Sequence, residues 1–114
     1  MHQIRHTAKE ITQSTPAGGA TISTTATRLF TEIKQGSVVH LANNHASQVI
    51  YGKFEVVGTI SSTITSTNWD FKLDAGETQQ FQMQSPHPTN ADKTIEIWIL
   101  GSGASTTYNA KRFM

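Results

Sequence analysis

Short segments of alternating apolar and polar residues recur at intervals of about ten residues along this chain, and they limit the possible fold more than any other feature. Residues that favour turns, mainly Gly, Asn and Pro, separate these segments. The clearest segments are Ser37–Asn43, Gln48–Val57 and Thr94–Leu100. Gly52 in the second segment predicts a bulge or a close backbone approach, and the Ser- and Thr-rich Thr59–Thr67 predicts a weak edge strand plus a loop. No segment of convincing length has helical periodicity. Roughly eight such segments predict an all-β fold, an antiparallel β-sandwich of about eight strands.

The segment Trp69–Phe81 carries the largest apolar side chains next to a turn. Trp69, Phe71 and Leu73 alternate with charged residues, as in a half-buried strand. Gly76 follows within Asp74–Glu77, where a glycine can adopt a positive φ. The chain then returns toward Phe81, so this segment predicts a hairpin or a tight corner.

The length of 114 residues fits one domain with a modest core. Residues 1–20 are polar and contain a Pro- and Gly-rich loop at Ser14–Gly19, so we expect an extended N-terminal arm there. This arm would carry an edge strand around residues 5–12 or, less favoured, a short helix. Residues 21–114 would form the sandwich domain.

The composition argues against several classes of protein. Hydrophobic residues make up 36% of the chain and the net charge is +1, which argues against a disordered chain and against a nucleic-acid-binding surface. Charged residues reach only 15%, and Ser and Thr occupy the polar strand positions instead. There is no cysteine, no apolar run of membrane-spanning length and no signal-peptide core. We therefore expect synthesis in the cytoplasm.

Few residues suggest a metal site or catalysis. Two close histidine pairs occur without a third ligand nearby, so we expect no bound metal; they are His2 with His6 and His40 with His45. The carboxylates near the predicted turn are expected to be solvated rather than catalytic; they are Asp70, Asp74 and Glu77. Gly101–Gly103 lacks the lysine and the helix of a phosphate loop and is predicted to be a hairpin link. The sequence thus predicts neither an enzyme nor a cofactor.

One resemblance to known proteins covers about residues 37–83. Ser37–Asn43, a strand that ends in Val56-Val57, and Leu73–Glu77 leading to Phe81 resemble the layout of small immunoglobulin-like or jelly-roll sandwich modules. The cysteines of antibody domains are absent. Modules of this kind occur in the particles of bacterial viruses, as capsid decoration or head-tail proteins. The small size, the absence of cysteine, the low charge, the Thr- and Ser-rich strands and the possible arm look like those of such proteins. This likeness implies a non-enzymatic structural protein of the virion, made in the host cytoplasm.

A surplus of apolar residues supports an assembly role. Ile95–Leu100 is apolar on both faces toward its end, whereas a two-layer sandwich buries one face of each sheet. The outward face would be an exposed apolar patch unless the N-terminal arm of the same chain covers it. A neighbouring subunit could cover it instead, which would make it an interface in a homo-oligomer or with the major capsid protein. The expected interface residues are Ile4, Ile11, Val49, Tyr51, Trp98, Leu100 and Phe113.

A second class of function stays open for the same fold. Tyr51 and Trp69 are the aromatic residues best placed to be exposed, and exposed aromatic rings stack on sugars. A glycan- or receptor-binding β-sandwich module is therefore the alternative to the virion subunit.

Overall fold

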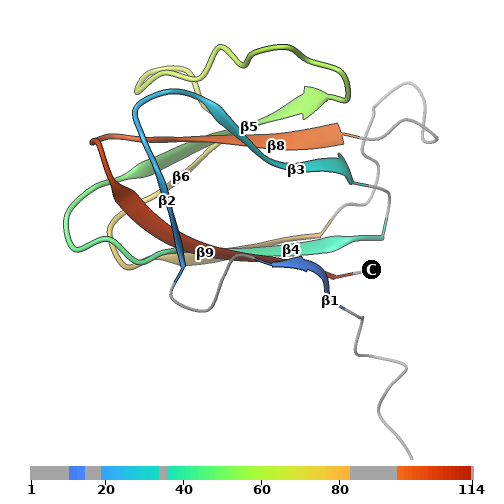
Figure 1. The fold of residues 1–114 in the computed structure, drawn as a ribbon, viewed down its shortest axis with the longest axis horizontal. Helices are drawn as coiled ribbons and strands as arrows, with labels where there is room; N and C mark the ends of the chain where they lie inside the picture. Colours follow the sequence, from blue (N-terminus) through green and yellow to red (C-terminus); the bar gives the residue numbers. More distant parts are fainter. Residues whose placement is uncertain (1–10, 15–18, 34–35, 83–94, 114) are drawn as a thin grey trace, which may run out of the picture.

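A computed structural model of the chain describes residues 11–14, 19–33, 36–82 and 95–113. These residues form two antiparallel β-sheets packed face to face, as predicted (Figure 1). None of the described residues is helical, so none of them forms a helix that could cross a membrane.

The first sheet has the strand order β1-β9-β4-β7, and β2 also pairs with β9. Two short strands therefore follow one another along the same edge of β9, where Ile11 lies opposite Phe113 and Ala20 opposite Tyr108. The bounds of these strands are β1 Ile11–Ser14, β2 Ala20–Ile22, β4 Val38–Asn43, β7 Thr78–Gln82 and β9 Thr106–Phe113. The described part of the predicted arm is thus an edge strand, and its residues 1–10 lie outside the described part of the chain.

The second sheet has the strand order β3-β8-β5-β6. Its strands are β3 Thr27–Ile33, β5 Ile50–Val56, β6 Phe71–Leu73 and β8 Ile95–Gly101. The central pair β5–β8 keeps an unbroken register from Ile50 opposite Gly101 to Val56 opposite Ile95. This register places alternate residues of β8 toward the other sheet, as the sequence pattern requires.

The core lies between the two sheets. Its side chains come from the inward positions of both layers; the largest fully buried members are Ile33, Val39, Leu41, Ile50, Leu73, Ile97 and Ile99. Tyr108 also lies in this core, and burial raises the pKa of its phenol.

Gly52, in the middle of β5, leaves room for an aromatic ring. The ring of Phe71 on β6 lies against the glycine so closely that a Cβ atom there would come within 1.9 Å of the Phe71 Cζ atom. The sequence predicted a bulge or a close approach at Gly52, and the structure shows the close approach.

The turn after Leu73 is a corner between sheets rather than a hairpin. β6 pairs with β5 in one sheet, and β7 pairs with β4 in the other. Gly76 has a φ of 81°, as expected for this turn. The Glu77 carboxylate accepts a hydrogen bond from the Asp74 backbone N–H at 2.6 Å, which closes the turn.

Two further predictions of local structure were wrong. Thr59–Thr67 was expected to be a weak edge strand plus a loop, but only the loop is present, with one bridge that joins Thr65 to Asn68. Gly101–Gly103 was expected to link a hairpin, but β8 and β9 belong to different sheets. Alternation along a strand shows which residues share a face and does not show which strands are neighbours.

Candidate functional site

The expected interface on the outer face of the second sheet is partly covered by the chain itself. Trp98 projects outward from β8, as the sequence pattern indicates, but it is only 5% exposed. Val49, Tyr51 and Leu100 lie on the same face and are half-buried. The prediction of an exposed patch centred on Trp98 was therefore wrong for this residue.

Two charged residues enclose Trp98. The guanidinium carbon of Arg28 lies 5.3 Å from the centroid of the indole ring, within the range of a cation–π contact. The Trp98 indole N–H donates to the Glu96 carboxylate at 2.9 Å, and Arg28 forms an ion pair with the same carboxylate at 3.3 Å. Glu96 is fully buried, so this carboxylate depends on its partners in the fold.

The segment of residues 57–70 passes over the same outer face, above β5 and β8 in Figure 1. The Gly58 N–H donates to Glu96 at 3.2 Å, and the Ser62 hydroxyl donates to Glu55 at 2.6 Å. Ile64 is buried in this segment, outside the main core, whereas Ile60 is 93% exposed. A Ser- and Thr-rich loop thus lies over part of the outer face that was expected to bind a partner.

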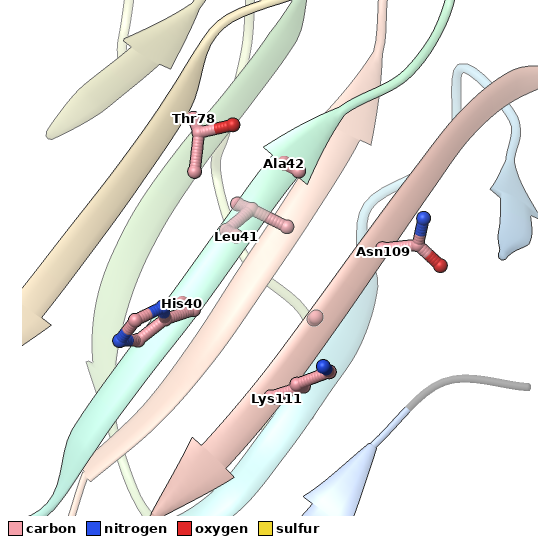
Figure 2. A pocket seen from close by; sticks show the side chains of 7 residues that line it. His40, Leu41, Ala42, Thr78, Asn109 and Lys111 are labelled. Atoms are coloured by element: carbon pink, nitrogen blue, oxygen red, sulfur yellow. The ribbon is translucent and has the colours of Figure 1, made fainter. Parts of the chain in front are cut away.

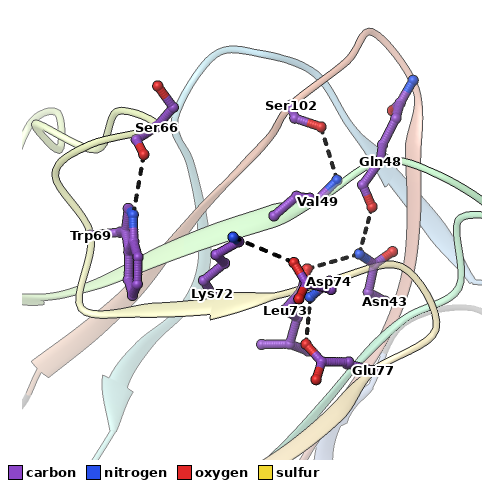
Figure 3. A network of polar contacts seen from close by, with 10 residues as sticks. All are labelled: Asn43, Gln48, Val49, Ser66, Trp69, Lys72, Leu73, Asp74, Glu77 and Ser102. Atoms are coloured by element: carbon purple, nitrogen blue, oxygen red, sulfur yellow. Dashed lines mark hydrogen bonds and ion pairs between the residues drawn. The ribbon is translucent and has the colours of Figure 1, made fainter.

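Tyr51 and Trp69 form an aromatic pair beside this covered region. Their ring centroids lie 6.4 Å apart, with ring planes tilted by 38°. The alternation placed Trp69 on one face with Phe71 and Leu73, but β6 begins only at Phe71. The Trp69 side chain is 41% exposed, in line with the expectation that it is one of the exposed aromatic residues. Its indole N–H donates to the Ser66 carbonyl at 3.2 Å, which fixes the ring at the surface (Figure 3).

Two ion pairs flank the aromatic pair. The Lys53 ammonium lies 4.0 Å from the Asp70 carboxylate, and Lys72 lies 3.5 Å from Asp74. Asp70 also accepts a hydrogen bond from the Phe54 backbone N–H at 2.9 Å. The carboxylates near the corner therefore have structural partners.

Asn43 organises this end of the sandwich, a role that its sequence position alone did not reveal. Its side-chain amide is buried and donates to the carbonyl oxygens of Gln48, at 2.8 Å, and Leu73, at 3.0 Å, while its oxygen accepts from the His45 N–H (Figure 3). The Asn43 backbone also exchanges hydrogen bonds with Gly76 and Glu77. Its position at the end of an apolar strand was the available signal.

The described histidines have separate roles. His45 Nδ1 accepts hydrogen bonds from the backbone N–H groups of Ser47 and Gln48, and the His40 ring packs 5.1 Å from that of Phe113. Within residues 11–14, 19–33, 36–82 and 95–113, no group of three or more His, Cys, Asp or Glu residues is placed to hold a metal. His2, His6 and the expected interface residue Ile4 lie outside these ranges.

The outer face of the first sheet carries a shallow hollow of about 200 Å³ (Figure 2). It lies across β4 because the small Ala42 is the cross-strand neighbour of Thr78 and Asn109. His40 and Lys111 lie at its other end, and its lining contains no carboxylate. Phe113, the expected interface residue beside His40, is half-buried near this end.

The four sheet edges differ in how they are protected. β3 has two register irregularities, β6 has three residues, and the edge of β9 is filled by two short strands. β7 instead has five residues in unbroken register with β4, and the described residues place no strand on its other side. Its sequence, Thr-Gln-Gln-Phe-Gln, contains no charge and no proline.

Comparisons of this chain with protein-family models, curated proteins and solved structures found no match. Its function is therefore inferred from the geometry described above.

Proposed function

We propose that this chain is a non-enzymatic structural subunit that binds neighbouring subunits through the free edge of β7. An exposed strand edge is a row of unpaired N–H and C=O groups that can template the addition of another strand. Soluble proteins protect such edges with charges, prolines, bulges or short strands. Among the described residues, β7 lacks all four devices, which makes its edge the observation that carries this proposal.

A second surface supports contact with partner subunits. Val56, Val57 and Ile60 follow one another from the end of β5 and are all exposed, so they place apolar area at one tip of the sandwich. They replace Trp98 as the apolar side chains available to a partner.

The setting that we propose is the particle of a bacterial virus, where the chain would act as a capsid decoration or head-tail subunit. The sandwich fold, the low charge and the free edge support this role. The partner would be a second copy of the chain or the major capsid protein. This setting predicts that purified particles of the encoding virus contain the chain at a fixed copy number, which quantitative mass spectrometry measures. Its absence from such particles would exclude a virion role.

Strand addition can be tested with charges placed on β7. The variant Gln80→Lys/Gln82→Lys adds two positive charges to exposed positions of the edge. We expect sedimentation velocity to show an oligomer of the full chain that this variant shifts toward monomer. The matched control Thr24→Lys/Ser105→Lys adds the same charge at exposed positions outside the strands and should leave the oligomer intact. A wild-type chain that stays monomeric, alone and with capsid protein, contradicts the proposal.

A further inference from the structure

Trp69 presents the surface of its ring rather than its polar atom. Because the indole N–H is already bonded to the Ser66 carbonyl, a ligand gains no hydrogen bond from it. The ring nevertheless remains 41% exposed at a fixed position. A tryptophan held in this way offers a rigid apolar surface on which a flat ligand face can stack.

Tyr51 adds a polar group beside that surface. It projects from the outer face of β5, and its cross-strand neighbours are Lys72 and Leu100. Its ring is half-buried and packs near Trp69, with 6.4 Å between centroids. Within the described part of the chain, its hydroxyl forms no hydrogen bond, so it can donate to or accept from a ligand.

The charges around the two rings cancel. Two lysines and two aspartates pair as Lys53 with Asp70 and Lys72 with Asp74, so the site has no formal net charge. Phosphate-rich ligands require a surplus of positive charge, and acidic sugars gain little from a neutral site. The partly exposed ammonium and carboxylate groups can still bond hydroxyl groups.

We infer that Tyr51 and Trp69 form a binding platform for a neutral carbohydrate. The C–H face of a pyranose ring stacks on Trp69, and the Tyr51 hydroxyl with the flanking ion pairs bonds the sugar hydroxyls. The platform lies on the sheet opposite to β7, so this inference stands independently of strand addition.

The test uses the full chain and a panel of neutral oligosaccharides built from glucose, galactose, mannose or N-acetylglucosamine. Tryptophan fluorescence and two-dimensional NMR would follow each titration up to about 10 mM, a range suited to weak sites. We expect at least one neutral sugar to shift the Trp69 indole resonance. Single-stranded DNA and heparin serve as anionic comparators and should not bind at this position.

Variants then assign the binding to the platform. Trp69→Ala should weaken binding by about tenfold or more, whereas Trp69→Phe should retain part of it because an aromatic face remains. Tyr51→Phe should weaken binding about threefold through loss of its hydroxyl. The matched control Ile60→Ala truncates an exposed apolar residue outside the platform and should change nothing. Circular dichroism confirms that each variant is folded.

Three results overturn the inference. The first is that no neutral sugar perturbs Trp69 across the panel. The second is that sugar binding survives Trp69→Ala in a folded variant. The third is that DNA or heparin binds these residues more tightly than any neutral sugar.

Discussion

The side-chain amide of Asn43 donates a hydrogen bond to the carbonyl oxygen of Leu73 at 3.0 Å, which joins the end of β4 in one sheet to the end of β6 in the other. Its second hydrogen bond, to Gln48, holds the connection that leads into β5. One buried side chain therefore fixes the corner and the neighbouring turn together.

Replacement of Asn43 by Ala should destabilise the protein by about 3 kcal/mol, because buried carbonyl groups lose their donor. Chemical denaturation measures this change in the free energy of unfolding. Asn44→Ala is the matched control, since the side chain of Asn44 is exposed. Equal stability of the two variants would show that the Asn43 amide has no special role.

The close contact between Gly52 and Phe71 predicts that substitutions at these two positions are coupled in their effect on stability. Gly52→Ala alone should cost about 2 kcal/mol, since the new methyl group overlaps the Phe71 ring. Phe71→Leu removes that ring and should be less harmful in the Gly52→Ala background than in the wild-type protein. A double-mutant cycle by denaturation measures the coupling. Strictly additive effects would contradict a direct clash.

Arg28 and Lys72 should respond unequally to substitution. Arg28→Leu removes a partner from a fully buried carboxylate and should cost about 2–3 kcal/mol, although the Arg28 side chain is 44% exposed. Lys72→Leu removes the cation of an exposed ion pair and should cost less than about 1 kcal/mol. In a Trp69→Phe background, Trp98 is the one remaining tryptophan, and its fluorescence follows unfolding.

Tyr108 should make the folded protein less stable at alkaline pH. Burial raises its pKa above the usual value of 10.0, so the phenol keeps its proton in the folded state after the unfolded state begins to lose it. The stability that this group contributes is complete below pH 10 and falls as the pH rises through the folded-state pKa. Tyr108→Phe should therefore reduce the loss of stability between pH 9 and about pH 11. Denaturation midpoints at both pH values would measure it, and an unchanged pH slope would contradict this assignment.

The sequence was sufficient to predict which residues of a strand face inward or outward. It was not sufficient to predict which segment lies over the outer face of the second sheet. Alternation correctly placed Ile97 and Ile99 inward and Trp98 outward. It could not predict that residues 57–70 would lie over the outer face, because the hydrogen bond from Gly58 to Glu96 joins distant segments and Ile64 is the one buried hydrophobic residue in this loop. Glu96, a charged residue in an apolar strand, was the local sign of an unusual environment.

The candidate sites could be predicted only in part from the sequence, because they too depend on contacts between distant segments. The residue types of Tyr51 and Trp69 suggested an aromatic surface, but their distance and the paired lysines depend on the register of β5 with β6. That β7 lies at an edge among the described strands depends on strand order, which short alternating segments do not determine.

β9 is the central partner of its sheet, since β1, β2 and β4 all pair with it although they come much earlier in the chain. During synthesis on the ribosome, β1 and β2 pair with no other described strand, so they remain unpaired until β9 has been made. Completion of the fold therefore depends on contacts between distant parts of the chain, which slows folding and leaves the early strands open to misassociation until β9 emerges.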